Sequence, residues 1–223
     1  SFAGYYMPVN YNKGIKYEYE SVRNNVGIFD VSHMGEIRIS GDNANIFLEI
    51  VTVNDISKLN SGDAQYSLIC NNDGFILDDI IIYKIGESDF LLVVNASNCQ
   101  KIIEWLKVNN NTFNDLGNKK IRITNQTEKY SLIAVQGPLS RDVLSEIFSY
   151  DISLKFYKHE KISFNKEIVL LSRTGYTGEL GFEILSTAII IESIWKLLLK
   201  LKVVPCGLAV RDILRIEMKY CLY

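Results

Sequence analysis

The chain has 223 residues, of which 48% are hydrophobic, and its formal net charge is −2. This length suffices for one large or two small domains with buried cores. The near-neutral charge argues against a nucleic-acid-binding surface, and no apolar run approaches the length that crosses a membrane. With only two histidines, His33 and His159, a His-rich metal site is excluded and a Ser-His-Asp triad is disfavoured.

The four cysteines lie far apart and form no CxxC pair, which indicates neither a zinc site nor a redox motif. We expect reduced, mostly buried thiols, as is typical of an intracellular protein. The chain begins in apolar sequence without an initiator Met or a signal pattern, and it ends on apolar residues without a helix cap. Both ends are therefore expected to be truncations of a longer chain.

The first half of the chain is predicted to alternate helices and strands. Hydrophobic periodicity predicts helices over 14–25 and 44–51, a helix capped by Ser97 and running through Val108, a short strand within 26–35, and strands over 36–40, 64–70, 80–85 and 90–95. This order favours an antiparallel sheet with helices on one face. The run of Asn, Gly and Lys in 109–120 is predicted to be a linker.

An acidic pair follows a strong turn signal in this half. The turn at residues 71–74, Asn-Asn-Asp-Gly, predicts a hairpin. Asp78 and Asp79 then stand at the mouth of the strand that begins at Ile80. Because neighbouring residues of a strand face opposite sides, one carboxylate must face the apolar side. There it must be paired, hydrogen-bonded or shifted in pKa. The alternative is a solvated turn that carries two surface acids.

The second half is predicted to add strands over 121–124, 130–135, 156–164, 167–172 and 182–184, and helices opening at Gln136-Gly137-Pro138 and spanning 186–202 and 208–220. Glycines at every third position of 173–184 predict a tight, close-packed hairpin. They do not match a dinucleotide-binding loop, because their spacing differs and no helix follows directly.

Three charged residues of this half need partners. Glu183 interrupts an apolar strand, either as a site residue or as an outward-facing acid of a half-exposed strand. Arg211 and Arg215 are four residues apart and share a helix face. Salt bridges to Asp212 and Glu217 are the simpler interpretation of that pair of arginines.

Six polar residues at strand ends, turns and a helix start have no obvious local partner: Tyr66, Asp79, Asn95, Tyr176, Glu183 and Arg211. A flat, nitrogen-rich heterocycle could be bound by these groups, which are two carboxylates, a guanidinium, two phenols and an amide. A carboxylate can pair bidentately with an N–H/NH₂ edge, and aromatic or Met side chains can sandwich the ring. Met34, beside Gly35, is either such a surface or core filler. A pterin is therefore a reasonable ligand, although these residues do not select it uniquely.

The resemblance to a known family rests on a series of motifs in order: Phe29-Asp30-Val31-Ser32-His33-Met34, Ile76-Leu77-Asp78-Asp79-Ile80, Val94-Asn95-Ala96, Gln136-Gly137-Pro138, Gly175-Tyr176-Thr177-Gly178-Glu179 and Gly207-Leu208-Ala209-Val210-Arg211-Asp212. From Phe2 to Tyr223 the chain resembles the aminomethyltransferases, the T-proteins of the glycine cleavage system. Two relatives on the same folate-binding scaffold, dimethylsulfoniopropionate demethylase and the iron–sulfur-assembly folate protein, are not expected to keep both the Asp-Asp pair and the Ser-His-Met turn.

The resemblance implies an α+β fold with two mainly antiparallel sheets and flanking helices. It places a first, discontinuous folate-binding domain in residues 1–35 and 121–223, and a second, ferredoxin-like domain in residues 36–120. The family's further C-terminal barrel domain is expected to be absent from this chain.

The resemblance also implies an enzyme that moves an aminomethyl group from the lipoyl carrier (H) protein to tetrahydrofolate, which acts as a substrate. Asp79 matches the acid beside the reacting folate nitrogens, and Glu183 matches the carboxylate that grips the pterin edge. The remaining matched folate-site residues are Tyr176, Arg211, Tyr66, Asn95 and Met34. No metal, PLP, flavin, nucleic acid or membrane is implied, and the expected compartment is the bacterial cytoplasm or the mitochondrial matrix. The alternative is a folate-binding or regulatory module without turnover.

Overall fold

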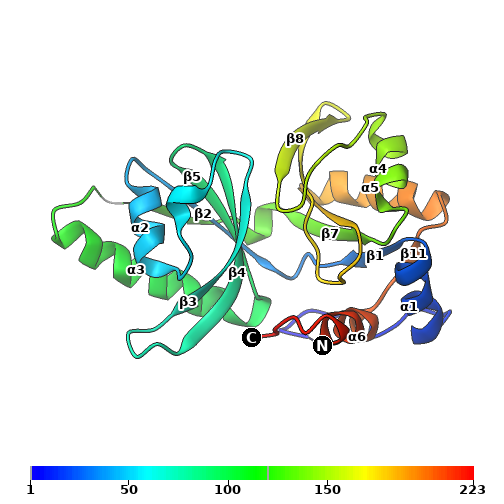
Figure 1. The fold of residues 1–223 in the computed structure, drawn as a ribbon, viewed down its shortest axis with the longest axis horizontal. Helices are drawn as coiled ribbons and strands as arrows, with labels where there is room; N and C mark the ends of the chain where they lie inside the picture. Colours follow the sequence, from blue (N-terminus) through cyan, green and yellow to red (C-terminus); the bar gives the residue numbers. More distant parts are fainter. Residues whose placement is uncertain (1, 120) are drawn as a thin grey trace. The chain divides into compact units, whose positions relative to one another are not determined.

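The computed structural model describes residues 2–119 and 121–223. The chain divides into two compact units, which Figure 1 shows in ribbon form. Unit 1 comprises Ser1–His33 and Lys129–Cys221, and unit 2 comprises Met34–Glu128 and Leu222–Tyr223. Each unit contains one mainly antiparallel sheet with flanking helices, so the expected α+β class is confirmed.

Unit 1 contains a six-stranded sheet in the order β11-β1-β7-β10-β9-β8. Its strands are β1 (Gly27–Asp30), β7 (Ser131–Gln136), β8 (His159–Phe164), β9 (Glu167–Ser172), β10 (Gly181–Ser186) and β11 (Val204–Pro205). Its helices are α1 (Ile15–Asn24), α4 (Ser140–Phe148), α5 (Ala188–Lys200) and α6 (Leu208–Glu217). Strands β1 and β11 are parallel, and the other neighbours are antiparallel.

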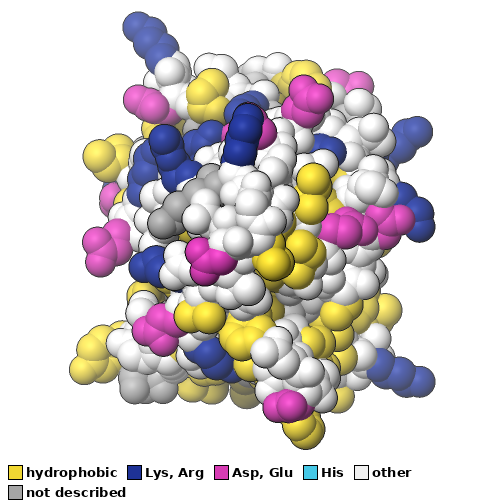
Figure 2. All heavy atoms as spheres, turned by 90° about the vertical axis from the view of Figure 1, so that its left-hand side faces the viewer, with side chains coloured by type: hydrophobic (Ala, Val, Ile, Leu, Met, Phe, Trp, Pro, Cys, Tyr) yellow, Lys and Arg dark blue, Asp and Glu magenta, His cyan; other side chains and the backbone are white. Residues whose placement is uncertain are grey.

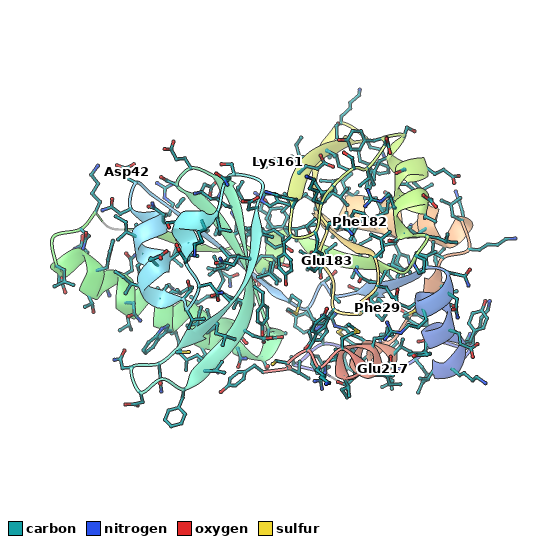
Figure 3. All side chains as sticks on the ribbon, in the orientation of Figure 1. Phe29, Asp42, Lys161, Phe182, Glu183 and Glu217 are labelled. Atoms are coloured by element: carbon teal, nitrogen blue, oxygen red, sulfur yellow. The ribbon has the colours of Figure 1, made fainter. Side chains whose placement is uncertain are left out.

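The core of unit 1 explains which way Glu183 faces. Phe182 and Ile184 of β10 are fully buried in one apolar cluster with Ile194 and Leu198 of α5. Because strand side chains alternate between faces, Glu183 emerges on the opposite face of the sheet. Phe182 and Glu183 are both labelled in Figure 3. The glutamate therefore does not interrupt the core.

The start of α6 is held by the N-terminal segment of the chain. The N–H groups of Leu208 and Ala209 donate to the carbonyl oxygens of Pro8 and Val9, each at 3.0 Å. Residues at a helix start have no intrahelical acceptor for these protons, so the segment satisfies them. Unit 1 thus joins residues from both ends of its sequence.

A buried carboxylate completes this junction. Glu18 of α1 is 0% exposed, and its carboxylate accepts from the N–H of Tyr11 at 2.5 Å and of Gly207 at 2.8 Å. Both oxygens of the buried group are therefore satisfied, as a buried carboxylate requires. A Cβ at Gly207 would overlap the backbone of Val9, so the close approach requires glycine.

Unit 2 contains a five-stranded antiparallel sheet in the order β3-β4-β5-β2-β6. Its strands are β2 (Gly35–Ser40), β3 (Ala64–Cys70), β4 (Ile76–Gly86), β5 (Asp89–Val94) and β6 (Arg122–Asn125). Its helices are α2 (Ala44–Val51) and α3 (Cys99–Asp115). Short 3-10 turns lie at Ile56–Lys58, Ala96–Asn98 and Thr127–Lys129. The last of these turns ends at Lys129, where the second segment of unit 1 begins. The helices pack on the face that carries Ile37, Ile80, Ile82 and Leu92. On the surface drawn in Figure 2, acidic, basic and apolar side chains are interspersed.

Two predicted boundaries in unit 2 are wrong. Strand β4 begins at Ile76 rather than at Ile80, so the acidic pair lies inside the strand. Helix α3 continues to Asp115, so residues 109–115 are not a linker; Lys120, at the end of that predicted linker, lies outside the described residues. The Asn110 side chain bonds to both N–H and C=O of Ile121, and these tertiary contacts outweigh its weak helix propensity.

Other expectations also change in detail. Asn98 rather than Ser97 precedes α3 as its N-cap, because residues 96–98 form a 3-10 turn. All four cysteines are free, but Cys206 alone is buried and Cys221 is exposed, so the expectation of mostly buried thiols is wrong. The structure divides after His33 and after Glu128, and β6 joins the sheet of unit 2. The domain assignment itself stays a prediction.

Candidate functional site

The seven predicted site residues lie in both units. Unit 2 contains Met34, Tyr66, Asp79 and Asn95, whereas unit 1 contains Tyr176, Glu183 and Arg211. Met34 is half-buried and directly precedes β2. The other six form two clusters, each held by contacts within its own unit.

Asp79 is held through both of its carboxylate oxygens. The register of β3 and β4 pairs Leu68 with Asp79 and Tyr66 with Ile81, so Tyr66 and Asp79 are diagonal neighbours on one face. The Tyr66 hydroxyl donates to Asp79 Oδ2 at 3.0 Å, and Asn95 Nδ2 donates to Asp79 Oδ1 at 2.6 Å. The half-buried carboxylate therefore has a fixed orientation.

Asp78 points to the other side of β4 and is 0% exposed. Its carboxylate accepts three hydrogen bonds, from Asn95 N and Asn95 Nδ2 at 2.9 Å each and from Asn98 Nδ2 at 2.6 Å. Burial raises the pKa of Asp78, while the bonds from Asn95 and Asn98 oppose that rise. This confirms the prediction that one acid of the pair faces the apolar side and is hydrogen-bonded there.

Asn95 links the two acids. It follows β5, and its Nδ2 group donates to Asp78 Oδ1, Asp79 Oδ1 and the Asp79 carbonyl oxygen. An amide nitrogen has only two protons, so these acceptors occupy its whole donor capacity. What Asn95 can offer a ligand is consequently the acceptor Oδ1.

Glu183 anchors the cluster in unit 1. Thr174 Oγ1 donates to Glu183 Oε2, and the Ser172 and Thr174 hydroxyls are bonded to each other at 2.8 Å. The carboxylate is half-buried on the sheet face opposite the core. Burial raises the pKa of the nearby Tyr157 phenol, and the charge of Glu183 contributes to that rise. A carboxylate held in this way can accept further N–H groups.

Arg211 and Tyr176 form the second part of this cluster. The Arg211 guanidinium carbon lies 4.7 Å from the centre of the Tyr176 ring, and the Tyr220 ring stacks on Tyr176 at 5.9 Å. Burial lowers the pKa of Arg211, and the negative charge of Glu183 opposes this change. In the part of the chain that the structure describes, Arg211 forms no salt bridge. Its cation is thus available to an anionic ligand.

The simple salt-bridge interpretation holds for the neighbouring arginine only. Arg215 pairs with Asp212 at 2.7 Å, as expected. Glu217 instead pairs with Arg23 of α1 at 2.5 Å, and Arg23 also binds Glu179 at 2.7 Å. This network holds α1, α6 and the loop before β10 together.

A pocket in unit 1 adjoins Arg211. Its lining is made by Met7, Pro8, Tyr11, Phe29, Asp30, Cys206, Gly207, Leu208 and Arg211. His33, at the end of this unit's first segment, is buried, and burial together with the charge of Arg211 lowers its pKa to about 4. This histidine is therefore neutral at pH 7. His33 is part of the Ser-His-Met turn noted in the sequence, but it is not among the predicted site residues.

Sequence reasoning missed several contributors to the two clusters. Asn98, Thr174 and Tyr220 each contact a predicted site residue or its neighbour. Asn98 lies three residues after Asn95, and Thr174 lies two residues before Tyr176. This closeness in sequence to predicted site residues is the signal that could have identified them.

Among the described residues, no group of three or more His, Cys, Asp or Glu side chains could hold a metal ion. None of the helices described has the length and apolarity to cross a membrane.

The family model described as the GCVT N-terminal domain matches residues 1–223. The chain belongs to the GCVT family. This GCVT-family chain is 43% identical over 220 residues to an aminomethyltransferase of Staphylococcus epidermidis, covering 97% of the chain and 58% of the relative. It is 44% identical over 228 residues to one of Flavobacterium psychrophilum, covering 100% of the chain and 61% of the relative.

A solved structure agrees with this membership. The GCVT-family chain superposes on the glycine cleavage system aminomethyltransferase T from Bartonella henselae with a TM-score of 0.89 at 32% identity. The match covers 100% of the chain and 59% of that structure. The chain therefore spans about three fifths of the length of these relatives.

Proposed function

We propose that this chain is the folate-binding part of an aminomethyltransferase of the glycine cleavage system. The reaction takes the aminomethyl group from the lipoyl thiol of the carrier (H) protein and joins its carbon to tetrahydrofolate. The products are 5,10-methylenetetrahydrofolate, ammonia and the dihydrolipoyl carrier. Membership of the GCVT family over residues 1–223 supports the proposal. The structural observation that carries it is the Asp79 carboxylate, fixed by Tyr66 and Asn95.

The chemistry requires capture of a reactive carbon. When the thiolate leaves the S–CH₂–N group, the remaining iminium-like carbon must meet a folate nitrogen before it meets water. Holding the two reactants together in a dry site lowers this barrier by several kcal/mol. The two folate N–H groups lose their protons as the two new C–N bonds form. One proton ends on the departing thiolate, giving the dihydrolipoyl thiol, and the other on the departing amine, giving ammonia.

Asp79 is the catalytic residue of the proposal. Its carboxylate accepts the N–H of the attacking folate nitrogen and stabilises the positive charge that develops there. Tyr66 and Asn95 fix both oxygens before substrate binds, so little reorganisation is needed during the reaction.

The cluster in unit 1 supplies folate recognition. Glu183 accepts the N–H and NH₂ groups of the pterin edge, and Thr174 fixes its orientation. Tyr176 offers a flat apolar surface. Arg211, which forms no salt bridge among the described residues, binds an anionic group of the folate. In unit 2, Met34 packs on the ring and the Asn95 oxygen accepts an N–H.

The test separates an enzyme from a folate-binding module without turnover. Calorimetry first measures tetrahydrofolate binding by this chain, and an assay with aminomethylated lipoyl carrier then measures methylene transfer. Asp79→Asn should keep most folate affinity and lose transfer by at least about 100-fold. Asp73→Asn, an exposed acid of the same hairpin, is the matched control and should change neither.

Equal loss of binding and transfer in Asp79→Asn would argue against a chemical role for this carboxylate. Folate binding without transfer by the unaltered chain would favour the module. Absence of tetrahydrofolate binding by the unaltered chain would refute the proposal for this chain.

A further inference from the structure

Gln136 is a buried polar residue that the proposed reaction does not use. It is the last residue of β7 and is 1% exposed. Its Nε2 group donates to the carbonyl oxygens of Thr174 at 3.2 Å and Phe182 at 3.4 Å, and its Oε1 accepts from Thr177 Oγ1 at 2.8 Å. Both ends of the side-chain amide are therefore satisfied by one segment, residues 174–182, which we call the glycine loop.

Two glycines allow this amide to approach the backbone. A Cβ placed on Gly175 or on Gly181 would overlap the side-chain amide of Gln136. Any larger residue at either position would displace the amide or the loop. Gly175 and Gly181 thus accommodate a side chain from a different part of the sequence, whereas Gly178, between them, lies against Met218.

The residues that Gln136 binds adjoin two residues of the proposed folate site in sequence. Tyr176 lies between Gly175 and Thr177, and Glu183 follows Phe182, whose carbonyl oxygen binds Gln136. Thr174 uses its carbonyl oxygen for Gln136 and its hydroxyl for Glu183.

Strand pairing between β9 and β10 does not fix the path of this segment. Pairing between β10 and β9 extends only as far as Glu183 and Ser172. Residues 174–180 thus lie beyond the ladder that joins the two arms. Hydrogen bonds fix their path instead. Gln136 binds Thr174 and Thr177 at the start of the loop, whereas Arg23 binds Thr177 O and Glu179, and the Gly137 N–H binds Leu180 O.

We infer that Gln136 is a positioning residue that sets the glycine loop so that Tyr176 and Glu183 together present one folate-binding surface. This inference rests on the proposed function, because only there do Tyr176 and Glu183 contact folate. Gln136 acts through the loop backbone and contributes no group to the ligand.

The experiment compares a buried substitution that removes hydrogen bonds to the glycine loop with a buried substitution that does not. Gln136→Leu keeps much of the side-chain volume and removes all three hydrogen bonds. Ser186→Ala is the matched control, because Ser186 of β10 is 2% exposed and its hydroxyl donates to Ile168 O at 3.0 Å, outside the loop. Calorimetry measures tetrahydrofolate affinity, urea unfolding measures stability, and hydrogen exchange follows peptides within 173–183.

Gln136→Leu should weaken tetrahydrofolate binding about tenfold or more, the loss expected when a charge-assisted hydrogen bond is misplaced. It should also accelerate exchange within 173–183. Ser186→Ala should lower stability and leave the affinity and the loop exchange unchanged. A stability loss in Gln136→Leu with unchanged affinity and unchanged loop exchange would overturn the inference.

Thr177→Val tests the same contacts if Gln136→Leu does not fold. It removes the 2.8 Å hydrogen bond to Gln136, together with a longer one from the Glu179 N–H, with little change of shape. It should move affinity and loop exchange in the same direction by a smaller factor. If neither changes in a folded Thr177→Val protein, the inference fails. If the unaltered chain does not bind tetrahydrofolate while the variants still accelerate loop exchange, the proposed function fails and the fixing of the loop by Gln136 is supported.

Discussion

Asn95 Nδ2 lies 2.6 Å from Asp79 Oδ1 and donates a proton to it. The same nitrogen donates to Asp78 Oδ1 at 2.9 Å, although the two acids point to opposite faces of β4. One amide thus bridges two adjacent carboxylates, which would otherwise repel each other at this distance. The orientation of the proposed catalytic acid and the burial of its neighbour therefore depend on one side chain.

Asn95→Asp replaces the bridging donor with a third acid. Its carboxylate would face both Asp78 and Asp79, so we expect unit 2 to lose at least about 2 kcal/mol of stability at pH 7. Stability should recover as the pH falls through the range in which one of the three acids takes up a proton. Urea unfolding followed by Trp105 fluorescence, in a Trp195→Phe background, measures this; equal stability losses at pH 4 and pH 7 would contradict the bridging role.

Glu183→Ala should weaken tetrahydrofolate binding by about 2–3 kcal/mol, because the pterin edge loses charge-assisted hydrogen bonds. Calorimetric titration checks the value. Glu167→Ala is the control, since Glu167 is an exposed acid on the neighbouring strand β9. Unchanged affinity in Glu183→Ala would remove this carboxylate from the folate site.

Glu36 predicts a pH dependence of stability. It is 0% exposed, neither carboxylate oxygen has a hydrogen-bond partner among the described residues, and burial raises its pKa from 4.5 to about 8. The folded state therefore binds this proton more tightly than the unfolded state. Between pH 4.5 and about 8, the contribution of Glu36 to stability should fall by up to about 1.4 kcal/mol per pH unit as the pH rises.

Glu36→Gln removes this titration while keeping the shape of the side chain. The variant should gain stability over the unaltered chain as the pH rises from 5.5 to 7.5, as reported by Trp105 fluorescence during urea unfolding. Asp78 also has a raised pKa and titrates in both proteins, so the difference between them isolates Glu36. Parallel stability curves would show that the buried carboxylate is not protonated.

Glu18→Gln should destabilise unit 1 by about 2–4 kcal/mol. The new amide group must place an NH₂ against the N–H of either Tyr11 or Gly207, which leaves a buried donor unsatisfied. Trp195 fluorescence in a Trp105→Phe background measures the loss during urea unfolding. Glu20→Gln, at an exposed position of the same helix, should change stability by less than about 0.5 kcal/mol.

Much of the fold could be predicted because its signals are local. Alternation within β4 predicted opposite directions for Asp78 and Asp79, and the structure confirms one fully buried acid. The glycine spacing of 173–184 predicted a tight, close-packed hairpin. Strands β9 and β10 do form a hairpin with close packing at Gly175 and Gly181, but the connection over 173–180 is long rather than tight. Each of these predictions depends on residues close together in sequence.

The missed features depend on distant contacts. Alternation predicted a half-buried strand at 36–40, but Glu36 is fully buried on the face opposite Ile37. The Asn-rich end of α3 becomes helical because Asn110 finds partners at Ile121. The bonding of Gln136 to the glycine loop joins positions about 40 residues apart, so no local pattern could indicate it.

The contacts between Pro8 and Val9 and the start of α6 have a consequence for synthesis. A ribosome releases the chain from its N-terminus, so residues 34–128 can begin to fold while unit 1 still lacks its second segment. The carbonyl groups of residues 8 and 9 then lack their partners in α6 until Leu208 and Ala209 have left the ribosome. At ordinary elongation rates this takes roughly 10–40 s. During that interval the aromatic and apolar N-terminal segment is a natural target for chaperones.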